Sequence, residues 1–521
     1  MRVFKEYKEL LAPFLLVIFA VSLGIYFRPI MTIDETRYIG VAWEMFDKHS
    51  FILPLINGEP YDHKMPLLFW LIHLSWYIFG VNEFSFRFIP LIFALGNLFL
   101  TYKIYKSLWQ DDSEGATIAL WVLAGTVLYI FYSSLLMFDI MLGFWVLLAV
   151  YGIIKAFRGE NSGYYIIAVA VFFGVLTKGP VVGAYILPLF LGAKWYAKVN
   201  FSFYLKFAVA GLVGLIASLV WVIPAINLGG DAYAKGLLLK QSVGRAVNSF
   251  AHKRPIWWYI PVVIGFSMPW ILYSKFWQRV KDIKLDNSLK FLLIWIVGAF
   301  IIFSLISGKQ VHYLIPIVPA IAMLIARVYS TLNIVTYKAR TIGAVILILA
   351  IAFAVAGKFI NSQLHYLVDY KAISISFIVL LTYALILLFK EFKNKMTFIK
   401  ILAINSLLLM FSVHYIAHIY LKSQDLHKIS QKISDLQESG YTIIHYGKYA
   451  DQFHFLGRLH KPLKVMYNRN KIDNFLQKHP KSAVVVYKKR KTKYNKSAVL
   501  SSGKLRTTNI LLVPADKFKE F

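Results

Sequence analysis

The sequence contains no cysteine, so neither a disulfide nor a thiolate metal site is open to it. It is also poor in charged residues, which make up 16% of the chain, and poorest in acidic ones, with 26 Asp and Glu against 57 Lys and Arg. A water-soluble fold of 521 residues could not hide a hydrophobic content of 58% in its own core. The chain therefore belongs in a bilayer.

The formal net charge of +31 is a feature of nucleic-acid binders as well as of membrane proteins. Here the cations lie in short loops between apolar stretches, and no contiguous basic fold with interleaved aromatic residues is found. Anionic lipid headgroups and the excess of Lys and Arg in cytoplasmic loops account for this distribution. We therefore expect membrane lipids, and no nucleic acid, among the partners.

Apolar stretches long enough to cross a hydrocarbon core of about 30 Å as helices recur along the chain. The first ends at Arg28-Pro29 with no small-residue cleavage site, so we expect an uncleaved anchor. The pattern predicts about 13 transmembrane helices. They lie near residues 11–27, 84–104, 115–135, 139–157, 163–178, 180–197, 206–226, 256–275, 291–306, 311–329, 341–357, 372–390 and 400–421.

Every even-numbered connection between these spans is basic, as cytoplasmic loops are. With a cytoplasmic N-terminus, an odd number of spans sends the tail to the opposite side. The tail alternates short apolar runs with helix-like segments, which favours a small α/β domain. The predicted organisation is a polytopic α-helical membrane domain over residues 1–421, with interfacial helices in an external loop over 28–83, and an extracytoplasmic α/β domain over 422–521.

Ionisable residues that are not ordinary cytoplasmic-loop cations fall at the outer ends of the expected spans. Charge near hydrocarbon is costly, so its retention there indicates a functional site. Asp34 is the first candidate, because a carboxylate just beyond the first span can orient or deprotonate an acceptor; helix capping is the alternative. Asp139 interrupts an apolar run between two spans, where capping explains less, and we expect it to hold the acceptor or the external loop.

A cationic pocket for a departing phosphate is the second expectation. Lys178 lies in the tight reversal Thr177-Lys178-Gly179-Pro180, and Tyr313 follows Lys309 by one helical turn. Each residue alone is better explained as a snorkelling cation or an interfacial tyrosine. The group is not, because outer loops are poor in Lys and Arg. The candidates for this pocket are Lys64, Lys178, Arg245, Lys309 and Tyr313.

Histidines at positions 63, 252 and 312 raise the question of a metal site. They are dispersed along the chain, and no spacing of His and Asp resembles a ligand set. The sequence therefore predicts no metal ligands among the candidate residues. It leaves open a divalent metal ion as a possible cofactor.

Five stretches, in order along the chain, resemble the ArnT-like aminoarabinose transferases of the GT-C superfamily, which also holds the protein O-mannosyltransferases. They are Asp34-Glu35-Thr36-Arg37-Tyr38, the most specific; His63-Lys64-Met65-Pro66-Leu67 with Gly80-Val81-Asn82-Glu83-Phe84; Leu176-Thr177-Lys178-Gly179-Pro180; Pro255-Ile256-Trp257-Trp258-Tyr259-Ile260-Pro261; and Ser307-Gly308-Lys309 through Tyr313, Pro316 and Pro319. Two positions depart from the family pattern. Met65 stands in a usual Lys-Pro-Pro, and Gln310-Val311 stands where Leu-Pro commonly follows the lysine.

The resemblance implies a thirteen-helix membrane domain of GT-C fold with a periplasmic α/β tail. It also implies inverting transfer of a sugar, such as 4-amino-4-deoxy-L-arabinose, from undecaprenyl phosphate to lipid A on the periplasmic face of the inner membrane. The residue matching Asp34 is then essential, the one matching Asp139 supports it, and those matching Lys64, Arg245 and Tyr313 contact the carrier phosphate. Further candidates from the same stretches and their surroundings are Glu35, as a catalytic carboxylate, and Arg37, Tyr38, His63 and His252.

Two rival functions are considered. A transporter or flippase would also be a basic helical bundle, but it is expected to bury ionisable residues at mid-span and to show repeated halves. Here the ionisable residues gather at one membrane face, and no internal repeat is visible. Protein O-mannosylation is the alternative among enzymes. The sequence favours a carrier-dependent glycosyltransferase.

Overall fold

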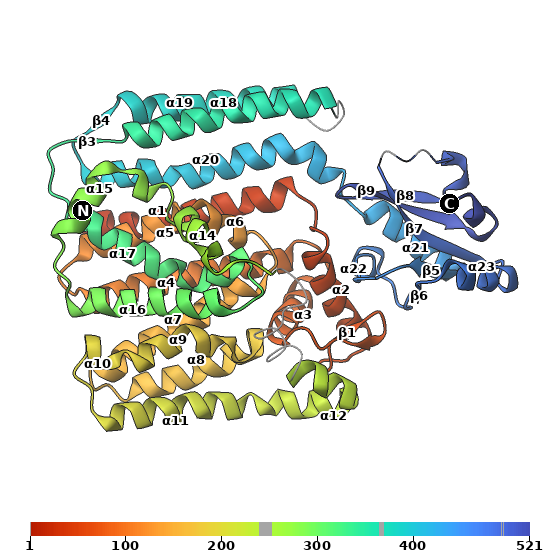
Figure 1. The fold of residues 1–521 in the computed structure, drawn as a ribbon, viewed down its shortest axis with the longest axis horizontal. Coiled ribbons are helices and arrows are strands. Elements are labelled where there is room, and N and C mark those ends of the chain that lie inside the picture. Colours follow the sequence, from red (N-terminus) through yellow and green to blue (C-terminus); the bar gives the residue numbers. More distant parts are fainter. Residues whose placement is uncertain (1, 239–252, 364–368, 491, 493) are drawn as a thin grey trace.

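The computed structural model describes residues 2–238, 253–363, 369–490, 492 and 494–521. Two candidate site residues, Arg245 and His252, lie outside this part of the chain. The long helices run side by side as a bundle, with the N-terminus at one end and a sheet-containing C-terminal domain at the other (Figure 1).

The helical bundle is made from the first 422 residues. Its elements are α1 (Arg2–Phe27), α4 (Ile89–Leu108), α5 (Ser113–Ala124), α6 (Val127–Ser133), α7 (Phe138–Phe157), α8 (Ser162–Lys178), η2 (Gly179–Val181), α9 (Val182–Leu191), α10 (Ala193–Tyr196), α11 (Phe201–Ala217), α12 (Leu219–Lys235), η4 (Ile256–Trp258), α14 (Tyr259–Ser267), η5 (Trp270–Leu272), α15 (Ser274–Asp282), α16 (Asn287–Leu305), η6 (Val311–Ile317), α17 (Val318–Ser330), α18 (Arg340–Gln363), α19 (Tyr370–Phe389) and α20 (Lys395–Lys422). Strands β3 (Tyr337–Lys338) and β4 (Glu391–Phe392) pair antiparallel between α17 and α20.

Polar side chains define where several of these helices begin. Asp112, Asn200, Asp286 and Asn394 precede α5, α11, α16 and α20, and each accepts a hydrogen bond from a backbone N–H in the first turn. This satisfies donors that a helix start otherwise leaves unpaired. Each cap follows a basic or polar connection, so the sequence ends the loop and starts the apolar run within a few residues.

Nine helices among the described residues are long and apolar enough to cross a membrane, or ten when the bent pair α5 and α6 counts as one span. Shorter apolar helices occupy Leu67–Phe79, Ile256–Ser267 and Arg340–Ala356. Each of the 13 expected spans falls on one of these segments, and two of them, 163–178 and 180–197, share the stretch Ser162–Leu191. The chain is thus a multi-pass membrane protein, as predicted.

Several expected spans are not single continuous helices, among them those over 115–135 and 256–275. The span expected over 115–135 bends by 65° between α5 and α6. Gly125 at this break lets Trp270 and Ala403 approach its backbone more closely than a side chain would allow. In the span expected over 256–275, the nine-residue α14 lies between the short η4 and η5 and ends before Pro269, a residue without the N–H that a helix needs.

Residues 28–83, which the sequence predicts to be an external loop, carry their own secondary structure. They contain α2 (Asp34–Asp47), a hairpin of β1 (Leu55–Ile56) and β2 (Glu59–Pro60), and α3 (Leu67–Phe79), and the short η1 (Ser85–Phe88) follows them. Apolar side chains of α2 and α3 pack into one cluster with residues of the C-terminal domain. The loop therefore forms the layer between the bundle and that domain.

The C-terminal domain is a five-stranded sheet with the order β6-β5-β7-β9-β8. Its elements are α21 (His427–Glu438), β5 (Thr442–Tyr446), α22 (His454–Gly457), β6 (Lys464–Met466), α23 (Arg469–Lys478), β7 (Ser482–Lys489), η7 (Lys496–Ala498), β8 (Ser501–Leu505), β9 (Thr508–Pro514) and η8 (Ala515–Glu520). Strands β6, β5 and β7 are parallel, and β9 joins β7 and β8 antiparallel. The predicted α/β fold of the tail is confirmed.

The central strand β7 explains how this domain is seated. Ala483 and Val485 point into the cluster shared with the external loop, whereas Val484 and Val486 point into a separate cluster with α23 and η8. Alternation along a strand sends successive side chains to opposite faces. Because both faces are covered, residues 483–486 of β7 form an uninterrupted apolar run.

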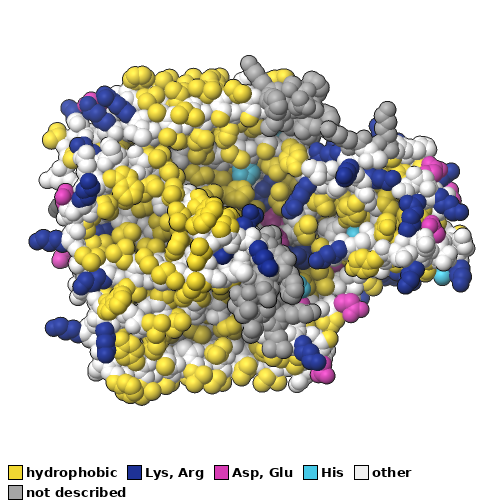
Figure 2. Space-filling view, viewed as in Figure 1, with side chains coloured by type: hydrophobic (Ala, Val, Ile, Leu, Met, Phe, Trp, Pro, Cys, Tyr) yellow, Lys and Arg dark blue, Asp and Glu magenta, His cyan; other side chains and the backbone are white. Residues whose placement is uncertain are grey.

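The surface matches a membrane protein. Apolar side chains cover most of the helical part of the visible face, and Lys and Arg gather at the end that holds the N-terminus and over the C-terminal domain (Figure 2). Apolar side chains such as Phe201 and Val220 are 80% and 72% exposed, which lipid rather than water makes favourable.

Candidate active site

Asp34 is the first residue of α2, directly beyond the end of α1. Its side chain is 59% exposed and forms an ion pair with Arg37, one helical turn further on. The residue before the helix is Ile33, and no side chain caps this helix start. Helix capping therefore does not account for Asp34.

Glu35, its neighbour, is buried in a network that ties three segments together. Its carboxylate lies 2.5 Å from the Arg28 guanidinium and accepts the backbone N–H groups of Met31 and Leu136, each at 2.7 Å. Burial alone would raise the pKa of Glu35, but the Arg28 charge and these hydrogen bonds hold it below the ordinary value. Glu35 thus fixes α2 against the segment that leads into α7, and its oxygens are occupied by protein groups.

Asp139 lies in the first turn of α7, three residues after Leu136. Its carboxylate is 2.6 Å from the ammonium of Lys178, at the end of α8, and the two side chains are only 3% and 14% exposed. The Lys178 ammonium also lies 4.8 Å from the centre of the Tyr313 ring. Gly179, with a φ of 73°, makes the reversal that the sequence predicts after Lys178. The structure thus brings Asp139, Lys178 and Tyr313 together.

Lys64 reaches the same place from the external loop. Its ammonium lies 5.4 Å from the centre of the Tyr38 ring and 5.2 Å from that of Phe138, the residue before Asp139. The two rings pack edge to face at 5.1 Å. Burial raises the pKa of the Tyr38 hydroxyl, so that group stays protonated. Lys64 therefore lies between the first turn of α2 and the first turn of α7.

Electrostatics links these residues into one group. The carboxylate of Asp139 interacts with the charges of Lys178, His312 and Lys64. His312, at the start of η6, interacts in turn with Asp139, Lys178, Lys64 and Asp34. Side chains from residues 28–83, α7, α8 and η6 thus converge in one group.

Comparison with known proteins places this arrangement in a wider group. Residues 62–223 match the family model described as dolichyl-phosphate-mannose-protein mannosyltransferase. The undecaprenyl phosphate-α-4-amino-4-deoxy-L-arabinose arabinosyl transferase 1 of Pseudomonas fluorescens is 28% identical over 307 residues, which are 56% of this chain and 54% of that protein. The corresponding transferase of an Enterobacter species is 29% identical over 329 residues, 58% and 56% of the two chains. The chain spans about half the length of the curated relatives it matches.

Solved structures match over nearly the whole chain. ArnT from Cupriavidus metallidurans bound to undecaprenyl phosphate superposes with a TM-score of 0.73 at 15% identity, over 96% of this chain and 97% of that one. Its apo state gives a TM-score of 0.71 at 16% identity, over 96% and 98%. The fold is ArnT-like. The resemblance expected from the sequence motifs, and with it the GT-C fold class, is confirmed.

Lys309 makes contacts that the sequence analysis does not anticipate. It is 3% exposed, and its ammonium donates to the backbone carbonyls of Ile306 at 2.6 Å and Arg254 at 3.2 Å. An ammonium directed at two carbonyls stabilises the loop before η6. The contacts of Lys309 are therefore those of a loop anchor.

The remaining candidates lie around the periphery. Arg37 pairs with Asp34, and His63 stacks on Tyr61 with its Nε2 3.3 Å from Asp62. Among the described residues, neither His63 nor His312 belongs to a group of side chains that could hold a metal ion. Sequence reasoning did not anticipate the role of Arg28, because an arginine after a span looks like an ordinary interfacial cation.

Proposed function

We propose that this chain is an inverting glycosyltransferase that moves a sugar, such as 4-amino-4-deoxy-L-arabinose, from undecaprenyl phosphate to lipid A on the periplasmic face of the inner membrane. The observation that carries the proposal is the convergence of Asp34, Lys64 and the buried Asp139–Lys178 pair at the outer ends of the spans, in an ArnT-like fold. The names of the curated relatives and the undecaprenyl phosphate bound to the Cupriavidus protein support the choice of donor.

The chemistry is a displacement at the anomeric carbon. An oxygen of the acceptor forms the new bond to that carbon as the bond to the carrier phosphate oxygen breaks, and the phosphate keeps the electron pair. Asp34, exposed and paired with Arg37, orients the acceptor and takes its proton where the attacking group is a hydroxyl. The products are the glycosylated acceptor and the free carrier phosphate.

The leaving phosphate gains negative charge next to a low-dielectric boundary, where a fixed cation is worth more than in water. In the proposal Lys64 and Tyr313 contact this phosphate. Lys178 is neutralised in part by Asp139, so the pair sets the position of the Tyr313 ring and of the first turn of α7. Arg245, outside the described residues, remains a proposed phosphate contact from the family resemblance alone.

Asp34→Asn tests the assigned carboxylate. Because the amide cannot take a proton, transfer should fall by about a hundredfold or more, while the exposed position leaves folding unchanged. The measurement is transfer from purified carrier-linked sugar, together with the yield of membrane-inserted protein. Glu59→Gln is the charge-matched control, because it removes the exposed carboxylate of Glu59, which lies in β2 of the same loop. Near-normal turnover by Asp34→Asn would remove Asp34 from the mechanism.

The family model that matches residues 62–223 favours protein O-mannosylation as a second candidate function. Purified protein supplied with a labelled carrier-linked sugar and both lipid A and a protein acceptor separates the two. Label in lipid A supports the proposal, and label in protein supports the second function. Movement of the carrier between leaflets without any transfer would contradict both and indicate a transporter.

A further inference from the structure

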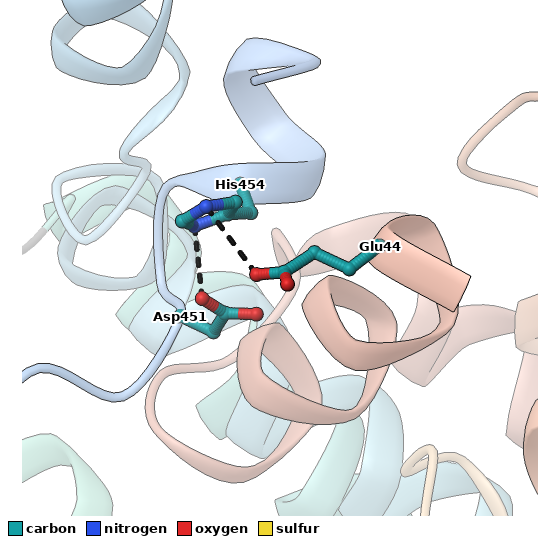
Figure 3. A group of neighbouring side chains, drawn as sticks. All are labelled: Glu44, Asp451 and His454. Carbon is teal, nitrogen blue, oxygen red and sulfur yellow. Dashed lines mark ion pairs between the residues drawn. The ribbon is translucent and has the colours of Figure 1, made fainter. Parts of the chain in front are cut away.

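A buried group of three ionisable side chains lies between the external loop and the C-terminal domain, away from the proposed active site. Glu44 comes from α2, Asp451 from the segment before α22, and His454 from the first residue of α22 (Figure 3). Their exposures are 4%, 0% and 1%. One potential ligand atom from each residue lies within 4.8 Å of those of the other two.

The histidine ring stands between the two carboxylates. Its Nδ1 is 2.8 Å from Asp451 Oδ1, and its Nε2 is 3.4 Å from Glu44 Oε1. The Tyr449 hydroxyl also lies 2.8 Å from the same Nδ1. Three groups that can accept a hydrogen bond therefore crowd around one imidazole.

Asp451 is the least satisfied member of the group. Its Oδ1 faces His454 Nδ1, and its Oδ2 has no hydrogen-bond partner among the described residues, although the side chain is completely buried. Gly40, one turn before Glu44 in α2, makes room for it: a Cβ there would stand 2.9 Å from Asp451 Oδ2. A buried carboxylate without donors is costly unless a cation balances it.

An imidazole that binds a metal is neutral, so with both carboxylates ionised the three ligands would carry a net charge of −2, which a divalent cation would cancel. Glu44 is held in place by the backbone N–H groups of Asn57 and Gly58, the second at 2.8 Å, so its carboxylate is already oriented. Metal-ligating carboxylates are commonly fixed in this manner by further hydrogen bonds.

We propose that Glu44, Asp451 and His454 bind one divalent transition-metal ion, for which zinc is the best fit, and that this ion fastens the C-terminal domain to α2. Imidazole nitrogen with carboxylate oxygen is a ligand set that zinc accepts readily, whereas magnesium and calcium prefer oxygen alone. The chain has no cysteine, so any tightly bound zinc must have nitrogen and oxygen ligands.

The ion is structural rather than catalytic. Glu44 follows Asp34 by ten residues in the same helix, a distance of about 15 Å along the helix axis. It would join two segments that are more than 400 residues apart in sequence, where many other contacts already meet. Trp43 donates to the Leu459 carbonyl at 2.9 Å, and Asn57 exchanges two hydrogen bonds with Leu463.

The first experiment uses the full-length protein, purified in detergent with any affinity tag removed. Metal analysis after zinc exposure and dialysis should find a single zinc ion per chain, and X-ray absorption should show only nitrogen and oxygen neighbours. Removal of the ion by a chelator should lower the thermal unfolding temperature, and added zinc should restore it. None of these measurements depends on sugar transfer, so their failure is distinct from failure of the proposed function.

Asp451→Asn and Glu44→Gln identify the ligands, since each keeps the shape of the side chain while weakening its affinity for metal. Both variants should lose the bound zinc and the response to chelator. His460→Gln is the matched control, because His460 also joins the C-terminal domain to α2, through Asp47 at 2.6 Å, but its side chain is exposed. This control should retain the ion.

Two results would overturn the proposal. Protein that neither contains zinc nor gains stability from it would mean that a proton shared by His454 and the two carboxylates holds the group together. Zinc that remains bound in both ligand variants would place the metal elsewhere. Should a variant fail to fold, the metal content and absorption spectrum of the unmodified protein still decide.

Discussion

The Asp139–Lys178 pair illustrates what a single buried charge requires of its partner. Asp139 lies in the first turn of α7 and Lys178 at the end of α8, and their 2.6 Å contact is largely shielded from water. Removing one member of such a pair leaves the other charge buried and uncompensated, which costs about 3–5 kcal/mol, whereas removing both often costs little. The pair therefore orders the site through the balance of its charges.

We expect Asp139→Asn and Lys178→Met each to lower stability by about 3 kcal/mol, and the double variant to recover most of that loss. Transfer should stay low in all three, because Lys178, the charged neighbour of the Tyr313 ring, is removed in two variants and loses its counter-ion in the third. Thermal unfolding and transfer rates provide the measurement. Lys338→Met, in the exposed pair with Glu391, should change stability by less than about 1 kcal/mol. Strictly additive losses at Asp139 and Lys178 would contradict the coupling.

Lys64 and Lys309 are two lysines with different surroundings. Lys64 faces the proposed site, whereas Lys309 is hydrogen-bonded to backbone carbonyls. Lys64→Ala should lower the transfer rate by about a hundredfold with little loss of stability. Lys309→Ala removes two hydrogen bonds to carbonyls and should act chiefly on stability, by about 1–3 kcal/mol. The rate against donor concentration and the unfolding temperature distinguish these effects. A rate loss for Lys309→Ala equal to that of Lys64→Ala, with a non-additive double variant, would return Lys309 to the phosphate pocket.

Glu35 acts at the scale of whole elements, because its bonds to Arg28 and to the Leu136 backbone hold α2 beside the start of α7. Asp34 is next to Glu35 in α2, and Asp139 lies three residues after Leu136, so the contacts of Glu35 set the positions of both carboxylates. A change at Glu35 therefore moves both carboxylates without touching either. This is the basis of a test that separates positioning from chemistry.

Glu35→Gln should lower stability at neutral pH by about 3 kcal/mol, because Arg28 loses its buried counter-charge. The folded protein holds the Glu35 pKa below its ordinary value of 4.5, so this contribution is complete above pH 4.5 and is lost as the pH falls through the folded value. The variant should lack that acid-dependent step, and stability measured from neutral to acidic pH detects it. An unchanged acid profile would mean that other groups govern the acid response.

At the scale of helices, the sequence predicts the positions of the apolar segments but not their bends and breaks. Apolar length predicts 13 spans, and each of them falls on an apolar helical segment of the described residues, because lipid imposes one requirement on every crossing helix. It did not locate the bend at Gly125 or the break before Pro269, since those depend on which neighbours pack against them. In the same way, Asp34 and Asp139 stand out in the sequence as charges beside hydrocarbon. The role of Glu35 does not, because its partners come from two other segments.

At the scale of the whole molecule, the contact between residues 28–83 and the C-terminal domain is not predicted by any sequence pattern. The external loop and the C-terminal domain share one apolar cluster, although several hundred residues separate them. Trp76 of α3 stacks on Phe455 of α22 with the ring centres 5.4 Å apart and the planes 4° from parallel. Neither residue carries a local signal for the other. We propose that residues 1–421 and 422–521 are separate domains, although apolar side chains from both pack in one cluster.

This shared cluster predicts that the C-terminal domain is needed to order the external loop that carries Asp34 and Lys64. A chain that ends at Ser423 should still insert its spans, since their apolar length is unaffected. It should leave Trp43 and Trp76 exposed, and each aromatic residue withdrawn from its pocket costs about 1.5–3 kcal/mol. The loop should then be cut rapidly by protease, and transfer should be lost.

Two point variants make the test specific. Phe455→Ala removes the ring that stacks on Trp76 and should raise the rate of protease cleavage within residues 28–83. Phe475→Ala removes a ring of similar size from α23, which packs in the separate cluster on the other face of the sheet, and should leave the loop protected. Mass spectrometry of the fragments gives the cleavage sites. If the loop of the truncated chain and that of Phe455→Ala resist protease as well as the loop of the unmodified protein does, then the bundle alone orders α2 and α3. The C-terminal domain would in that case serve some other purpose.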